Sequence, residues 1–343
     1  LFSRKNDIDI VMFGEDFVPT KEELEPYASK GCIEPYESDC VFYPNYGREP
    51  LGDCGQILWI NFTWLERLGL EVPKTTEELK EVLVAFRDMD PNGNGLNDEI
   101  PLLSCDDGLP YRVSELLLEP YVYNDPYHDR EELSKDPEYF AGISYCNDLK
   151  KEELLLGEGG RYSMEEYTEL INSPLDIVGA FTADSLSKVI YQGNPEIMAG
   201  FMHVAPIAGP KGVRNALYVE RKPKAGAIIC SASGNKDKAK LLLDTMMTPE
   251  ASLIARYGEE GVDWDYSDGT DVSIYGTPST IVTRNYIWNT PQNKHLNGIG
   301  PMDVPLEYMK GVTWNGINSD SEYIDARAQM SYAAYLPKEQ GSH

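Results

Sequence analysis

The stretch ILWINFTWLERLGLEVPKTTEELKEVLVAF, residues 57–86, decides the fold of the chain. Its first four residues are apolar and suit a buried strand, whereas Phe62 to Leu68 is typical of a short helix that Gly69 ends. Thr75 and Glu78 have the spacing of a capping box, which predicts the start of a second helix. That helix is supported by apolar residues at helical spacing, namely Leu79, Val82, Leu83 and Phe86. A buried strand followed by two amphipathic helices predicts a layered α/β protein.

An oxygen-rich loop, DPNGNGLNDE at residues 90–99, follows the second helix. Side chains with oxygen atoms fall at positions 1, 3, 5 and 9 of this loop and glycine at position 6, which is the ligand spacing of a calcium loop. Because hard oxygen ligands select Ca²⁺ over zinc or copper, we predict a structural Ca²⁺ site. Its expected ligands are the side chains of Asp90, Asn92 and Asn94, the carbonyl of Leu96, and the carboxylates of Asp98 and Glu99.

The loop differs from an EF-hand, because position 12 is Pro101 and not a bidentate glutamate. Glu99, directly after Asp98, would have to replace that ligand. Unit charges 4 Å apart interact by about 4 kcal/mol at an effective dielectric constant near 20, so carboxylates this close repel one another unless a cation lies between them. The alternative is an Asn- and Gly-rich turn with solvated acids.

Composition and charge describe an acidic globular protein. The 343 residues suffice for two domains, and 30 basic against 57 acidic residues give a net charge of −27. Such a charge repels phosphate backbones, so we expect no nucleic acid partner. The chain begins at Leu1 with an apolar strand pattern at residues 7–13, and we therefore expect a processed product or a fragment.

The six cysteines contain no C-x-x-C pair, which disfavours zinc-ribbon and thioredoxin-like sites. Cys40 and Cys54 flank a segment rich in Tyr, Pro and Gly, and they could close a disulfide in an oxidising compartment. Buried free thiols are the alternative. The sequence leaves both possibilities open.

Several motifs resemble the extracellular solute-binding proteins of ABC importers. The resemblance is closest to the lipoprotein-type branch of the maltose-binding-like family (family 1) in Gram-positive bacteria. It implies an α/β, two-lobed, type II periplasmic-binding-protein-like fold, with a hinge and a ligand cleft between the lobes. The matching segments span about residues 8–270 and are LWIN (58–61), LGLEVPKTTEEL (68–79), DEIP (98–101), PIAGPKGV (206–213), residues 225–243 and YGEEGVD (257–263).

On the family plan the chain divides into two lobes and a tail. We expect residues 1–60 and 205–280 to form the first lobe, truncated at its N-terminal part because relatives have a further strand and helix there. Residues 61–204 form the expected second lobe, which carries the calcium loop. Residues 281–343 are expected as a C-terminal helical or irregular segment that packs mainly on the second lobe. In branch members that bind acidic oligosaccharides, the corresponding loop holds a structural Ca²⁺ remote from the ligand.

The resemblance implies a binding protein and not an enzyme. We expect the substrate-binding component of an ABC importer, which captures a small-molecule solute, an oligosaccharide, by hinge closure and delivers it to permease subunits. The expected protein is a monomer at the extracellular cell surface, membrane-associated through a lipid anchor of the full-length precursor that is not part of this chain. The alternative is a calcium-containing extracellular carbohydrate-active enzyme, a hydrolase or lyase, because a catalytic carboxylate pair is compatible with so many acids.

The expected ligand contacts combine aromatic rings with hydroxyl acceptors, since a sugar has apolar faces and a rim of hydroxyl groups. Residues after the first strand form a loop that faces the ligand in the family, and a stacking aromatic occurs near residue 181. For the tryptophans, core packing is the alternative. The predicted ligand-binding residues are Glu15, Asp16, Phe17, Trp59, Phe181, Trp288 and Trp314.

Overall fold

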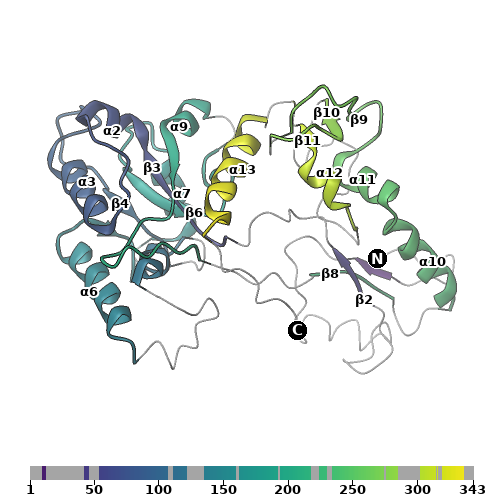
Figure 1. Ribbon diagram of the computed structural model, residues 1–343, viewed down its shortest axis with the longest axis horizontal. Helices are drawn as coiled ribbons and strands as arrows, with labels where there is room; N and C mark the ends of the chain where they lie inside the picture. The colour runs from purple at the N-terminus through teal and green to yellow at the C-terminus, as the bar shows by residue number, and fades with distance from the viewer. Residues whose placement is uncertain are drawn as a thin grey trace. The chain divides into compact units, whose positions relative to one another are not determined.

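The computed structural model divides the chain into two compact units (Figure 1). Unit 1 comprises Leu1–Pro50 and Arg221–Asp320, and unit 2 comprises Leu51–Glu220 and Ser321–His343. The residues that the structure describes are 10–12, 42–45, 54–106, 111–121, 135–159, 162–191, 194–217, 224–229, 234–273, 276–284, 302–313, 315 and 319–335.

Unit 2 is built on a five-stranded sheet in the order β5-β4-β6-β3-β7. At its centre, β3 (Ile57–Asn61) pairs antiparallel with β6 (Ala180–Ala183) and β7 (Phe201–Val204). The short strand β4 (Leu102–Leu103) runs parallel to both β6 and β5 (Leu155–Leu156). All five residues of β3 are buried, as expected for a continuous apolar run in the middle of a sheet.

Helices cover both faces of this sheet, because alternate residues of β3 point to opposite sides. Ile57 and Trp59 join the hydrophobic cluster of α7, α8, α9 and α13, whereas Leu58 and Ile60 join that of α2, α3, α4 and α6. Within the described residues no helix is long and apolar enough to span a bilayer. The helices of unit 2 are α2 (Phe62–Leu68), α3 (Thr76–Asp88), α4 (Val113–Leu118), the 3₁₀ helix η2 (Glu119–Tyr121), α6 (Pro137–Lys151), α7 (Met164–Ile171), α8 (Leu186–Val189), α9 (Pro195–Gly200) and, from Ser321 onward, α13 (Ser319–Ala333).

The helices predicted around Gly69 and Thr75 are confirmed in detail. α2 ends at Gly69, whose φ of +68° is the left-handed conformation that glycine adopts readily. Thr75 Oγ1 accepts a hydrogen bond from the Glu78 amide at 3.1 Å. The Glu78 carboxylate completes the turn differently from a capping box, because it accepts from the Lys74 amide at 2.7 Å and not from Thr75.

The described residues of unit 1 form two three-stranded sheets. The first has the order β1-β8-β2 and joins distant parts of the chain, β1 (Ile10–Met12), β8 (Lys224–Ile229) and β2 (Phe42–Asn45), in antiparallel pairs. The second has the order β11-β10-β9. Its strands and the helices of unit 1 are β9 (Trp264–Tyr266), β10 (Ile281–Thr283), β11 (Val312–Thr313), α10 (Lys236–Met246), α11 (Pro249–Tyr257) and α12 (Leu306–Lys310).

The unit boundaries differ from the lobe boundaries expected from the sequence. Residues 57–60, expected in the first lobe, belong to unit 2 because β3 is hydrogen-bonded on both sides by unit 2 strands. Residues 281–320 belong to unit 1, where β10 pairs with β9 and β11, and only the chain from Ser321 joins unit 2. Tyr332 ties α13 there, since its hydroxyl accepts from the Leu58 amide at 3.0 Å and donates to the Val204 carbonyl at 2.7 Å.

Candidate functional site

The loop at residues 90–99 folds around its own oxygen atoms. The Asp90 carboxylate accepts hydrogen bonds from the backbone amides of Asn94 and Gly95, each at 3.1 Å. Asn92 Oδ1 also accepts from the Asn94 amide, at 3.0 Å, and Asn94 Oδ1 accepts from the Leu96 amide at 2.7 Å. Gly95, at position 6, has a φ of +76°, so the turn needs glycine for its backbone conformation.

Asp98 draws the second half of the loop onto the first. Its carboxylate accepts from Asn94 Nδ2 at 3.0 and 3.1 Å and from Asn92 Nδ2 at 3.3 Å. Four of the six predicted ligands, Asp90, Asn92, Asn94 and Asp98, therefore lie in one hydrogen-bonded group, with Leu96 beside Asn94.

The Glu99 carboxylate has one oxygen atom without a hydrogen-bond partner among the described residues. This atom, Oε1, is buried. Burial, followed by the charges of Asp98 and Asp90, raises the pKa of the Glu99 carboxyl. A buried, unpartnered carboxylate oxygen beside two further acids is an arrangement that a cation satisfies.

The donor set of the loop fits a hard divalent cation. Every predicted ligand binds through an oxygen atom, and the two asparagines supply metal-binding oxygen atoms without adding charge. In the described part of the chain no three His, Cys, Asp or Glu side chains lie close enough to hold a metal by themselves. A cation here would therefore depend on asparagine and carbonyl oxygen atoms as much as on carboxylates.

Arg67 on α2 holds the start of the loop in place. Its NH1 group donates to the Pro91 carbonyl at 2.8 Å and lies 3.8 Å from the Asp176 carboxylate. Asp176, with a φ of +51°, in turn accepts from Asn61 Nδ2 at 2.8 Å and from Trp64 Nε1 at 2.9 Å. The loop is thus held by residues at and after the turn from β3 to α2, which lies within the stretch at residues 57–86.

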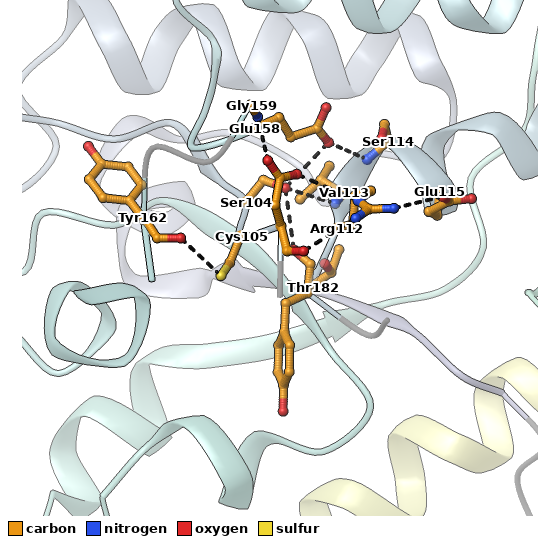
Figure 2. A network of polar contacts seen from close by, with 12 residues as sticks. Ser104, Cys105, Arg112, Val113, Ser114, Glu115, Glu158, Gly159, Tyr162 and Thr182 are labelled. Atoms are coloured by element: carbon orange, nitrogen blue, oxygen red, sulfur yellow. Dashed lines mark hydrogen bonds and ion pairs between the residues drawn. The ribbon is translucent and has the colours of Figure 1, made fainter. Parts of the chain in front are cut away.

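A second polar region lies at the opposite end of β4, where the parallel strands β4, β5 and β6 end. Figure 2 shows its contacts. The Glu158 carboxylate accepts from the Ser114 amide at 2.8 Å and from Ser104 Oγ at 3.3 Å, and it pairs with Lys150 at 2.5 Å. Asp106 accepts from the Gly159 amide at 2.6 Å. We call this end of the unit 2 sheet the carboxyl edge.

Among the described residues, Arg112, Lys150 and Lys188 at the carboxyl edge are each paired with an acid. Arg112 lies 3.5 Å from Asp106 and 3.4 Å from Glu115. Lys188 lies 2.5 Å from Asp184 Oδ2, as Lys150 does from Glu158.

Three side-chain oxygen atoms at this edge are buried and have no hydrogen-bond partner among the described residues: Gln56 Oε1, Asp184 Oδ1 and Gln329 Oε1. Gln56 immediately precedes β3 and Asp184 immediately follows β6, and the register that pairs Ile57 with Ala183 places them on neighbouring strands. Gln329 reaches them from α13, where its Nε2 donates to the Asp184 carbonyl at 2.9 Å. Ligands of open α/β sheets bind beyond the carboxyl ends of the strands, so this edge is a candidate binding site.

No protein-family model matches the chain. Among curated proteins, a segment of 55 residues is 54% identical to the fructooligosaccharide ABC transporter substrate-binding protein FusA of Streptococcus pneumoniae. A longer match of 235 residues is 23% identical to the lipoprotein LipO of Bacillus subtilis. These matches cover 16% and 63% of this chain, but only 10% and 45% of the two relatives.

Solved structures share the fold over nearly the whole chain. FusA in complex with kestose superposes with a TM-score of 0.64 over 96% of this chain and 73% of its own, at 19% identity. An extracellular solute-binding protein of Bifidobacterium longum subsp. infantis gives the same TM-score over 96% of this chain and 72% of its own, at 20% identity. The chain has the solute-binding-protein fold. The resemblance to ABC-importer solute-binding proteins and the predicted type II fold are confirmed.

Within the solute-binding fold, two predicted ligand-contacting aromatics lie in the core. Trp59 and Phe181 are both fully buried, at 0% exposure. Trp59 Nε1 donates to the Ala183 carbonyl at 3.2 Å, and the Phe181 ring packs edge-on against Phe201 and Tyr167. The other predicted ligand residues, Glu15, Asp16, Phe17, Trp288 and Trp314, lie outside the described residues.

Cys54 is a buried free thiol. Its Sγ donates to the Gln56 carbonyl at 3.0 Å, and burial raises the pKa of the thiol to about 12. Of the two possibilities that the sequence left open for this cysteine, the structure has the free thiol.

Sequence reasoning missed the polar residues of the carboxyl edge. No common motif links the three segments that contain Gln56, Asp184 and Gln329. The spacing of residues in a sequence also does not show which oxygen atom will lack a hydrogen-bond partner in the fold. A signal was available at two of them, because a polar residue directly before or after a buried apolar strand falls at the end of that strand.

Proposed function

We propose that the chain is the substrate-binding component of an ABC importer and captures an extracellular oligosaccharide. The observation that carries this proposal is the likeness to FusA, found both in a 54% identical segment and in the fold of almost the whole chain. FusA binds kestose, and a Bifidobacterium longum relative of the same fold is described as binding human milk oligosaccharides (HMO). The proposed class of ligand is therefore a saccharide.

The proposed mechanism is binding and release without chemical change. A ligand that contacts both units more extensively in a closed form draws them together, and this closed form is what permease subunits recognise. The proposed protein is a monomer at the extracellular surface, held there through a lipid anchor of its precursor. The lipoprotein LipO among its relatives supports the anchor.

We further propose that the loop at residues 90–99 holds a structural Ca²⁺. The unpartnered Glu99 Oε1 and the oxygen-only donor set support this assignment, as does the FusA variant described as an EF-hand mutant. Asp90, Asn92, Asn94, Leu96, Asp98 and Glu99 would hold the ion. Its role would be to neutralise the three carboxylates and to fix the connection between α3 and β4.

Thermal-shift screening against a saccharide panel, with and without chelator, tests both proposals. A bound saccharide raises the melting temperature in proportion to the logarithm of its concentration over its Kd. We expect neutral oligosaccharides to stabilise the chain and a chelator to lower its melting temperature. A panel that leaves the melting temperature unchanged contradicts the importer proposal, and an ineffective chelator contradicts the calcium proposal independently.

A further inference from the structure

We propose that the loop at residues 90–99 is a deamidation site whose reactivity is controlled by bound Ca²⁺. In the cation-free chain the side-chain amides of Asn92 and Asn94 convert to carboxylates, and a cation held by the loop prevents this conversion. The inference goes beyond the proposed saccharide-binding function, and only its second half rests on the proposed calcium site.

Both asparagines precede a glycine, in the pairs Asn92-Gly93 and Asn94-Gly95. Deamidation begins when the backbone nitrogen of the next residue attacks the Cγ atom of the asparagine, and a Cβ atom on that next residue hinders the attack. Glycine has no Cβ, and a Cβ built at Gly93 or Gly95 would meet no atom within 4 Å. Because both glycines are also exposed, the two attacking nitrogen atoms lie in open surroundings that water can reach.

The folded loop bends both asparagine side chains back over the glycines. Asn92 Oδ1 accepts from the Asn94 amide at 3.0 Å, and Asn94 Oδ1 accepts from the Leu96 amide at 2.7 Å. Each of these hydrogen bonds closes a ring that contains the Cγ atom of the asparagine and the nitrogen of the glycine after it. The ring limits how far the two reacting atoms can separate.

The reaction balances with water as its only co-reactant. The glycine nitrogen forms a bond to Cγ while the bond from Cγ to Nδ2 breaks, and Nδ2 leaves as ammonia with the proton of the glycine amide. The product is a cyclic succinimide. Water then opens this ring at either of its carbonyl carbons, which yields aspartate or isoaspartate. No atom is oxidised or reduced.

The conversion replaces attractive contacts in the loop with repulsive ones. The Nδ2 atoms of Asn92 and Asn94 donate to Asp98 Oδ1 at 3.3 and 3.0 Å. A carboxylate at either position has no proton to donate and repels Asp98 in the cation-free loop. Aspartate keeps an oxygen ligand at its position, whereas isoaspartate inserts a methylene into the main chain and so breaks the ligand spacing.

A bound cation should suppress the reaction by mass action. When the Oδ1 atoms of Asn92 and Asn94 are ligands of an ion, their side chains are fixed and Cγ no longer approaches the glycine nitrogen. Only the cation-free fraction of the chain then reacts. At a Ca²⁺ concentration of about 100 times Kd the rate should therefore fall about 100-fold, and it should be half-maximal when the concentration equals Kd.

The test follows deamidation of the full chain over time at constant neutral pH and ionic strength, in chelator and in a series of Ca²⁺ concentrations. Peptide mass spectrometry measures, at each asparagine, the mass gain from replacing an amino group by a hydroxyl group. The Asn94→Asp variant supplies the standard for the aspartate product, and thermal shift gives the Kd for Ca²⁺ independently.

The chain contains its own matched controls. Asn97 is exposed in the same loop but precedes Asp98, whose Cβ hinders the attack. Asn315 precedes a glycine, as the loop asparagines do, but belongs to unit 1. In chelator we expect Asn92 and Asn94 to react faster than Asn97, and we expect Ca²⁺ to slow the two loop sites without changing the rate at Asn315.

The inference is overturned if Asn92 and Asn94 react no faster than Asn97 in chelator. Its second half is overturned if Ca²⁺ raises the melting temperature but leaves the two rates unchanged, or if it slows Asn315 equally. Ca²⁺ that changes neither the melting temperature nor the rates refutes the calcium site and the control that depends on it. The proposed saccharide binding is measured separately and stands or falls independently of these results.

Discussion

The calcium loop and the carboxyl edge lie at opposite ends of β4, and both contain buried oxygen atoms without partners. In the loop the polar atoms belong to ten consecutive residues, and their carboxylates repel one another. At the edge they come from segments far apart in the chain, such as Gln56 and Thr182 or Asp184 and Gln329. In the loop, closeness in the sequence brings carboxylates near one another. At the edge, hydrogen bonds between residues far apart in the sequence fix the orientation of individual polar side chains.

Because of this difference, the two regions should depend on different interactions for their stability. Under the calcium proposal the loop depends on an added cation, because a positive charge offsets the repulsion among its acids. The edge depends on α13, whose residues Asp325, Gln329 and Tyr332 reach the ends of the strands. Substitutions at the edge should therefore act equally with and without Ca²⁺, and substitutions in the loop only with it.

The largest expected effect is at Asp325. Its carboxylate accepts from the amides of Leu186 and Ser187 at 2.5 and 3.3 Å and from the hydroxyls of Ser185 and Ser187, both at 2.7 Å. Asp325→Ala leaves these donors unpaired and should lower the free energy of unfolding of unit 2 by roughly 3 kcal/mol. Urea unfolding should show the same loss in Ca²⁺ and in chelator; a loss seen only in Ca²⁺ would contradict the separation of the two regions.

Calcium removal comes next. At a Ca²⁺ concentration of about 100 times Kd, binding should stabilise unit 2 by about 2.7 kcal/mol, which corresponds to a shift in Tm of roughly 5–10 °C. Asp98→Asn should lose most of this shift. Asp88→Asn is its control, since Asp88 pairs with Arg87 on the exposed end of α3; equal shifts in all three proteins would refute the assignment of the loop.

A smaller effect is expected at Tyr332. The hydroxyl bridges the Leu58 amide and the Val204 carbonyl, so Tyr332→Phe leaves two buried backbone groups without a partner. We expect a loss of about 1–2 kcal/mol, again independent of Ca²⁺. Tyr335→Phe, just beyond the C-terminal end of the same helix, should change the stability little. Comparable losses in the two variants would argue against the bridge.

The smallest effect is a pH dependence. Burial raises the pKa of Asp325 in spite of its four hydrogen bonds, so the folded chain holds this proton more tightly than the unfolded chain. The stability that this gives is complete below the unfolded pKa of about 3.9 and is lost as the pH rises through the folded pKa. Asp325→Asn cannot titrate, and its stability should therefore rise relative to the wild type over that range. A difference that is constant with pH, measured by urea unfolding, would contradict the raised pKa.

Local features were predictable from the sequence to the residue. The helix that ends at Gly69, the helix that begins after Thr75 and the turn at Gly95 each follow from side chains within a few positions of one another. The segment at residues 183–191, whose sequence favours a helix, shows the limit of local patterns. Its first residue belongs to β6, and only α8 (Leu186–Val189) is helical, because pairing with β3 overrides local preference.

Long-range features of the candidate site were not predictable in this way. Trp59 and Phe181 have aromatic rings of the kind that stack on sugars, but in the folded sheet both side chains are buried. Gln56 becomes informative only when the carbonyl of Arg112, 56 residues away, fixes its amide. Which side of a strand faces the core, and which polar atom is left without a partner, are properties of the assembled sheet.

The central claim is that this chain binds an oligosaccharide and leaves it intact. Its most direct test is a calorimetric titration with kestose and other neutral oligosaccharides in saturating Ca²⁺, after which the ligand is recovered and weighed by mass spectrometry. The account predicts saturable binding of one ligand per chain and recovery of the unchanged saccharide. Cleavage products, or no binding of any neutral oligosaccharide, would contradict it.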